Sequence, residues 1–129
     1  EDALEAVRAA QEEGVVPGGG TALLRASHSL AITTTHADQA IGATIVREAC
    51  KEPLRQMALN AGISPDIVIQ QVTDSDNSLG WDFRTGELTN LYNAGIIDPV
   101  KVTRSALQNA ASCAGTLITT NFGIIQTEE

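Results

Sequence analysis

The residues best suited to bind an anion or a nucleotide lie between Val15 and Thr21, where three consecutive glycines follow Pro17. Glycine loses more backbone entropy on ordering than any other residue, so such a run indicates a positive φ or a close approach by another group. Thr21 can cap a following helix, whose N-terminus presents free N–H groups and the positive end of the helix dipole. The run predicts either a nucleotide site or, as the simpler alternative, a tight corner between two helices.

Other side chains that could do chemistry are isolated in the sequence. Asp2 lies near the start of an expected helix, where an acid is favoured by the helix dipole, so its residue type alone indicates a structural role. His28 and His36 have no partner motif and are expected on the surface or in a loop. Cys50 and Cys113 form no CxxC motif, so we expect no metal cluster but two buried free thiols, which are typical of a reducing compartment.

Composition indicates a single helical domain. Of the 129 residues, 43% are hydrophobic but only 3% are aromatic, so the core must be built from Ala, Val, Ile and Leu, which suits close helix packing. The net charge of -8 argues against nucleic-acid and anionic-membrane partners. No apolar run reaches the roughly 18 residues that span a membrane, and we find no signal peptide. Because Glu1 lies inside an expected helix and is not Met, we expect a piece of a longer protein.

Helical periodicity predicts the elements that position the glycine run. An expected helix over 1–13 ends at Gly14, and another runs from 21 to about 30, followed by a loop over 33–36. Pro53 is expected to interrupt a helix near Glu52, and Ser64 to cap the next one. The same reasoning predicts further helices over 37–52, 54–61 and 64–72, a helical turn over 90–94 and a long helix over 99–117.

Patterning also predicts which elements are buried and where strands occur. The stripe of Ile41, Ile45 and Val46, like that of Ile67, Val68 and Val72, is expected to face the core. The helix over 99–117 is apolar on two sides, which is typical of the middle of a domain, with Asp98 as its N-cap and Pro99 in its first turn. A hairpin is expected from 79–83 and 87–89 with Gly86 at its turn, and a strand over 118–125.

Four separate motifs, in the right order, resemble the C-terminal part of a group I chaperonin, the cage-forming heat-shock class. The motifs are Glu1–Leu4, Glu12–Gly20, Glu52–Gln56 and Gly95–Leu107. The resemblance as a whole runs from Glu1 to about Thr120. The resemblance implies a mainly α fold: residues 1–12 end the ascending helix of the intermediate domain. Residues 13–129 then form the C-terminal half of the equatorial, ATP-binding domain, with a small hairpin and a C-terminal strand that pairs with a neighbouring subunit.

The resemblance also implies roles for single residues. Asp2 matches the carboxylate that positions the attacking water for ATP hydrolysis, and Gly18 and Gly19 lie at the turn beside the nucleotide. Asp98 matches the carboxylate near the ribose. Asp82 and Phe83 lie where the family holds the adenine, although many bacterial members have Asn-Ala-Ala where this chain has Asp-Phe-Arg, so those contacts are expected to be mostly backbone.

The implied activity is an ATPase that drives protein folding in response to heat and other stress. Its partners would be identical subunits in a heptameric ring, unfolded client proteins and a co-chaperonin, in the mitochondrial matrix or alternatively in a bacterial cytoplasm or plastid. The family's phosphate-gripping loop and the ligand for Mg²⁺ have no match here, so this chain alone is expected to be inactive. The alternative is an all-helical protein-interaction module in which Gly18–Gly20 is only a corner.

Overall fold

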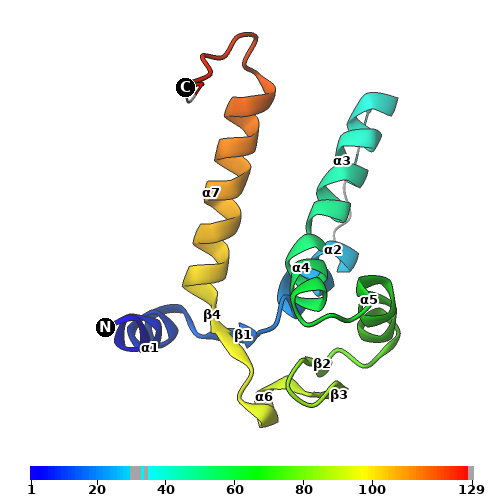
Figure 1. The fold of residues 1–129 in the computed structure, drawn as a ribbon, viewed down its shortest axis with the longest axis vertical. Coiled ribbons are helices and arrows are strands. Elements are labelled where there is room, and N and C mark those ends of the chain that lie inside the picture. Colours follow the sequence, from blue (N-terminus) through cyan, green and yellow to red (C-terminus); the bar gives the residue numbers. More distant parts are fainter. Residues whose placement is uncertain (30–32, 34, 128–129) are drawn as a thin grey trace. The chain divides into compact units, whose positions relative to one another are not determined.

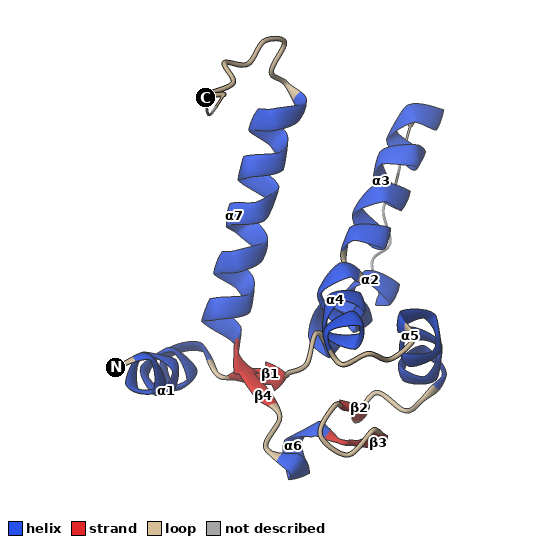
Figure 2. Ribbon diagram, viewed as in Figure 1, coloured by secondary structure: helices blue, strands red, loops and turns tan. Residues whose placement is uncertain are grey.

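The computed structural model describes residues 1–29, 33 and 35–127, and this part of the chain is mainly helical, as predicted (Figure 2). The expected helix end near Leu30 and part of the expected loop after it lie outside the described residues. The elements follow one another along the chain (Figure 1) as α1 (Asp2–Glu13), β1 (Val15–Pro17), α2 (Thr21–Ser29), α3 (Ala37–Ala49), α4 (Glu52–Asn60), α5 (Pro65–Asp74), β2 (Leu79–Asp82), β3 (Glu87–Asn90), α6 (Leu91–Ala94), β4 (Ile97–Pro99) and α7 (Val100–Ile118).

Local sequence signals set most helix boundaries. Gly14 ends α1 with φ 87, a conformation that side chains other than glycine rarely adopt. Helix α4 begins at Glu52, near the predicted restart, and Pro53 occupies its first turn, where the missing N–H needs no acceptor. Pro65 begins α5 in the same way, with Ser64 as its N-cap. These predicted boundaries are confirmed.

The predicted hairpin is confirmed as well. Strands β2 and β3 pair antiparallel, with Leu79 opposite Asn90 and Asp82 opposite Glu87. Gly86 has φ 72 at the turn, and its N–H donates to the carbonyl of Asp82 at 2.8 Å. Strands β1 and β4 form a second two-stranded sheet that the sequence did not predict, because runs of three residues carry no measurable alternation.

The chain divides into two compact units, each described here by itself. The terminal unit combines Glu1–Gly14 with Pro99–Glu129, and the central unit is Val15–Asp98. The family-derived domain boundary after residue 12 stays a prediction. In the central unit, α5 packs on α4 and against β2. Its core is aliphatic except for one ring, and consists of Leu24, Leu54, Ala58, Val68, Val72 and Trp81.

Helix α3 differs from the expectation that it faces the core. Ile41, Ile45 and Val46 are between 52% and 63% exposed, and α3 buries no side chain. Ile67 of α5 is also exposed, although its neighbours Val68 and Val72 are fully buried as predicted. Periodicity identifies an apolar stripe correctly, but burial needs an element to cover it, and none covers the α3 stripe among the described residues.

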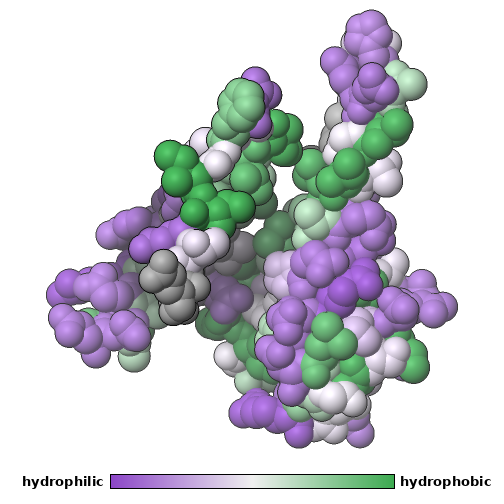
Figure 3. Space-filling model, turned by 45° about the horizontal axis from the view of Figure 1, so that its top comes forward, coloured by the Kyte–Doolittle hydropathy of each residue, from purple (hydrophilic) through white to green (hydrophobic). Residues whose placement is uncertain are grey.

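Helix α7 corrects three predictions. It begins at Val100, with an extended Pro99 as its N-cap, and Asp98 belongs to β4 and does not cap the helix. It buries no side chain, so it does not lie in the middle of a domain, and apolar residues reach the surface of the molecule (green in Figure 3). Cys113 on this helix is exposed, whereas Cys50 is buried as expected. Of the helices described, none has the length and hydropathy to cross a bilayer.

The tail after α7 contains no strand within its described residues. Ile118 ends the helix, and the following residues have no regular structure up to residue 127. Phe122 and Ile124 are essentially fully exposed. The expected strand over 118–125 does not form in this chain by itself, because a strand needs another edge to satisfy its N–H and C=O groups. Pairing of this tail with a neighbouring subunit stays a prediction.

Candidate functional site

The glycine turn lies flat against the chain segment that leads into β4. The N–H of Gly18 donates to the carbonyl of Ile96 at 2.9 Å. A Cβ placed on Gly18 would lie 3.2 Å from the carbonyl carbon and oxygen of Ile96 and from the nitrogen of Ile97. Those are backbone atoms of a paired segment, which cannot move aside easily. Gly18 is therefore needed for a close backbone approach.

The next two glycines are required for other reasons. Gly19 and Gly20 have φ 65 and φ 76, in the left-handed region that favours glycine. A Cβ on Gly19 would find room, since its nearest neighbours are 3.8 Å away, on Ile96 and at the carbonyl of Trp81. A Cβ on Gly20 would lie 2.8 Å from the backbone nitrogen of Leu54. The left-handed backbone conformation thus requires glycine at positions 19 and 20, and close packing requires it at positions 18 and 20.

Two segments that are distant in the sequence contact this turn. Gly18 contacts Ile96 and Ile97, which precede Asp98, and Gly19 faces the carbonyl of Trp81 in β2, which is followed by Asp82 and Phe83. The residues expected to bind a nucleotide within the central unit are therefore sequence neighbours of residues that contact the turn, and their binding role stays a prediction. Asp98 is exposed and does not cap α7. Phe83 is half-buried against the core.

Asp82 has a structural role in the hairpin. Its side chain is only 5% exposed, and its Oδ1 accepts a hydrogen bond from the N–H of Arg84 at 2.8 Å. The Arg84 guanidinium lies 3.6 Å from the same oxygen. This carboxylate oxygen is therefore engaged by the hairpin turn, and the expected contacts of Asp82 with a base stay a prediction.

Asp2 lies in the terminal unit. It is exposed in the first turn of α1, after Glu1, which occupies the N-cap position without a side-chain capping bond. Asp2 lines an open hollow of about 760 Å³ between α1 and α7, together with Arg8, Lys101 and Ser105. A carboxylate in an open hollow can orient a water molecule. The two cations of the hollow already pair with acids that line it, Arg8 with Glu5 and Lys101 with Glu12.

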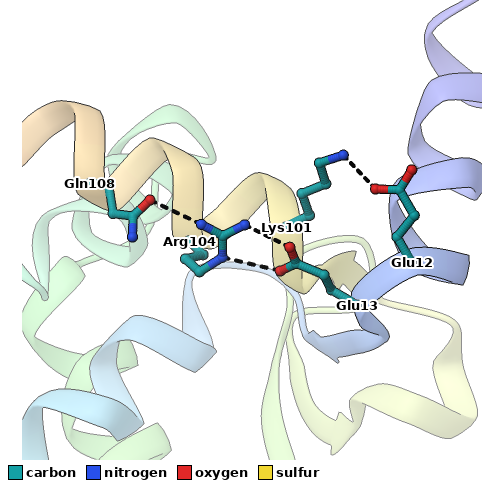
Figure 4. A network of polar contacts seen from close by, with 5 residues as sticks. All are labelled: Glu12, Glu13, Lys101, Arg104 and Gln108. Atoms are coloured by element: carbon teal, nitrogen blue, oxygen red, sulfur yellow. Dashed lines mark hydrogen bonds and ion pairs between the residues drawn. The ribbon is translucent and has the colours of Figure 1, made fainter.

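A network of ion pairs ties the end of α1 to the start of α7 (Figure 4). Glu13 accepts two hydrogen bonds from Arg104, at 3.1 Å from Nε and 2.6 Å from Nη2, and Lys101 donates to Glu12. Arg104 also donates to Gln108 at 3.0 Å. The sequence analysis missed these pairs. The only signal was charge complementarity between two adjacent acids and two cations three residues apart, far along the chain.

The network shifts the pKa values of its members. The hydrogen bond from Arg104 lowers the pKa of Glu13 below its ordinary 4.5, and Glu13 in turn raises the pKa of Arg104. The hydrogen bond to Glu12 raises the pKa of Lys101. A lowered carboxylate pKa means that the charged form is favoured by folding, so the stabilisation exists above the unfolded pKa and is lost as pH falls through the folded one.

We expect Glu13→Gln to reduce the acid sensitivity of the chain. Below pH 4.5, the ordinary glutamate pKa, the wild type loses the ion pair with Arg104, whereas the variant has none to lose. The free energy of unfolding of the two proteins, measured by urea denaturation from neutral to acidic pH, should therefore converge on acidification. Glu5→Gln is the control, because Glu5 only forms an exposed pair with Arg8. Parallel pH curves for wild type and Glu13→Gln would contradict this expectation.

Gly19→Val separates the two interpretations of the glycine turn. Valine at φ 65 should cost about 1–2 kcal/mol of stability, and Gly62→Val is a matched control because Gly62 has φ 71 and nothing near its Cβ position. If the turn lies against a nucleotide, only the Gly19 variant of the full-length protein should also lose ATP affinity. Titration of a fluorescent ATP analogue, beside melting temperatures, checks this. A lowered melting temperature with unchanged affinity would support the corner interpretation.

The described residues do not form a magnesium site. No group of three or more His, Cys, Asp or Glu side chains among them is arranged to hold a metal ion. The sequence analysis places the metal ligand outside this chain, and no step of the chemistry is assigned to the metal here.

A helical unit with a glycine turn between short strands matches one family of proteins. Residues 1–128 match the TCP-1/cpn60 chaperonin family, and the chain belongs to that family. A solved structure described as a group III chaperonin in the open state has 31% sequence identity and a TM-score of 0.78. The match covers 90% of this chain but 25% of that chain, so the present sequence spans a quarter of that protein's length.

Proposed function

We propose that this chain is the C-terminal part of the ATP-binding domain of a group I chaperonin. The observation that supports the proposal is the contact of Gly18 with Ile96 and Ile97 and of Gly19 with the Trp81 carbonyl, next in sequence to the proposed site residues Asp98, Asp82 and Phe83. The likeness to a group III chaperonin supports the class, and the four sequence motifs support group I. ATP is the proposed substrate, and the resemblance assigns its base and ribose to the glycine turn and its hydrolysis to Asp2.

In the assembled protein, binding and hydrolysis of ATP would drive the folding of enclosed client proteins. Phosphoryl transfer needs orientation and charge stabilisation from the protein, and the role of Asp2 is to orient the attacking water. The partners are further copies of the subunit in a heptameric ring, unfolded clients and a co-chaperonin. The compartment is the mitochondrial matrix, since Asp at position 82 resembles mitochondrial members.

We expect this chain alone to release no phosphate from ATP above background. Asp2 is its only proposed catalytic residue, and the family's phosphate-gripping loop has no match in its sequence. The measurement is a coupled phosphate assay on the purified chain beside the full-length ring, which should bind and hydrolyse ATP. Steady release by the chain that Asp2→Ala abolishes would overturn this expectation. A full-length ring that fails to bind ATP would overturn the proposed function itself.

A second function is favoured by the exposed apolar stripes of α3 and α7, namely a helical interaction module without a nucleotide role. In an assembled ring, neighbouring parts of the protein would cover these apolar stripes. Their exposure in this chain therefore does not decide between the two functions. Nucleotide binding decides, because an interaction module would leave the full-length protein unable to bind ATP even with the glycine turn intact.

A further inference from the structure

The glycine turn and helix α2 contact strand β2 at three pairs of positions. In the turn, Gly19 faces the carbonyl of Trp81, as described above. Thr21 is fully buried, and a Cβ on Gly80 would lie 2.8 Å from its Oγ1. One helical turn after Thr21, Arg25 donates from Nη2 to the carbonyl of Leu79 at 2.9 Å. The glycine turn and the start of α2 therefore lie alongside the strand that ends at Asp82.

Arg25 reaches well beyond this strand. The same Nη2 donates to the carbonyl of Asp76 at 2.8 Å and to Oγ of Ser75 at 3.1 Å, and Nη1 makes longer contacts to the Ser75 carbonyl at 3.4 Å and to Oδ1 of Asn77 at 3.5 Å. All five acceptors are uncharged oxygens of the segment 75–79, which connects α5 to β2. A planar guanidinium offers five donors in a fixed fork, whereas a lysine offers a single point charge.

These contacts hold the spacing between two halves of the proposed nucleotide site. The turn side is rigid because Gly18 and Gly20 pack on backbone atoms, and the strand side is connected to α5 by the loop that Arg25 holds. Packing at Gly80 prevents β2 from moving closer to α2, and the hydrogen bonds to Arg25 prevent it from moving away. We propose that Arg25 is a positioning residue that sets the separation of the glycine turn from β2, and thereby the fit of the base of the nucleotide.

The proposal rests on the proposed function for its nucleotide part, but its geometric part can be measured without a ligand. Trp81 is the only tryptophan of the chain and lies in β2, two residues after Leu79. It is 8% exposed, so its fluorescence reports any loosening of β2. The test variant is Arg25→Lys, which keeps the charge. The control is Arg55→Lys, because Arg55 lies in the same unit but pairs with the carboxylates of Glu52 and Asp66.

In this chain, Arg25→Lys is expected to raise the rate constant of acrylamide quenching of Trp81 by about twofold or more while the helix content by circular dichroism is unchanged. The milder Ser75→Ala removes one acceptor and should show a smaller change in the same direction, which keeps the test valid if Arg25→Lys unfolds the hairpin. Arg55→Lys should leave quenching unchanged. Unchanged quenching in Arg25→Lys overturns the proposal.

In the full-length protein, Arg25→Lys should weaken ATP binding on the order of tenfold, equivalent to about 1.4 kcal/mol, and should reduce the preference for ATP over GTP. A merely structural role would lower the folded fraction and weaken both nucleotides equally, so the ATP-to-GTP ratio is the deciding measurement. An unchanged ratio with faster quenching of Trp81 overturns the positioning role. Failure of the wild type to bind ATP overturns the proposed function, and the quenching experiment then decides the geometric part alone.

Discussion

Replacing Asp2 by alanine in the full-length protein is expected to slow ATP hydrolysis by about 10²- to 10⁴-fold, the range for a group that activates a nucleophile. ATP affinity should change far less, because a group that orients water acts mainly in the transition state. Asp2 is exposed in the first turn of α1, so its removal opens no cavity. Single-turnover hydrolysis and equilibrium binding of ATP, measured on the same preparation, separate the two effects.

A second carboxylate in the same hollow provides the control for this experiment. Glu5 lies close to Asp2 on α1 and lines the same hollow, and Glu5→Gln should leave the hydrolysis rate within about twofold of the wild type because Glu5 carries no proposed role. If Asp2→Ala lowered binding and turnover by the same factor, the role of Asp2 as a water-orienting base would be wrong.

Gly20→Ala is expected to destabilise the central unit by about 2–5 kcal/mol. A side chain at φ 76 costs about 1–2 kcal/mol by itself. The added Cβ would also lie 2.8 Å from the nitrogen and 3.0 Å from the Cα of Leu54, which are backbone atoms in the first turn of α4 and cannot rotate aside. Such overpacking costs about 1–3 kcal/mol more. Urea denaturation followed by Trp81 fluorescence measures the free energy of unfolding.

Gly62→Ala isolates the conformational part of that loss. Gly62 has φ 71, nearly the same as Gly20, but nothing lies within 4 Å of its Cβ position. It should therefore lose only the about 1–2 kcal/mol that belongs to the left-handed backbone. Equal losses in the two variants would show that α4 shifts to accommodate the new methyl group and that Gly20 is not held by packing.

Helix boundaries could be predicted from the sequence where a proline or a glycine at the boundary sets them. Pro53, Pro65 and Gly95 act on their own neighbours, so helix starts and the end of α6 could be predicted without knowledge of the fold. Burial could not be predicted in the same way. The apolar stripes of α3 and α7 are real, but burial depends on a covering element that a periodic pattern does not specify.

In the candidate site as well, local features could be predicted from the sequence, whereas contacts between distant segments could not. The glycine turn was evident because three adjacent glycines are unusual and have few physical explanations. Its contacts with β2 and with the segment before Asp98 depend on the meeting of segments far apart in the sequence, and β1 and β4 are too short to be predicted from alternation. The ion pair of Glu13 with Arg104 was missed for the same reason, since both side chains are ordinary surface residues on their own helices.

The division of the chain into a central and a terminal unit has a consequence for the order of folding. The central unit is continuous in sequence, whereas the terminal unit is assembled from both ends of the chain. Before β1 and β4 pair, closing the intervening loop costs entropy that grows with the logarithm of its length. Once they pair, Gly14 and Val100 are already within reach, and the N–H of Val100 donates to the Gly14 carbonyl at 3.0 Å. We therefore expect docking of α1 on α7 to follow the pairing of β1 with β4.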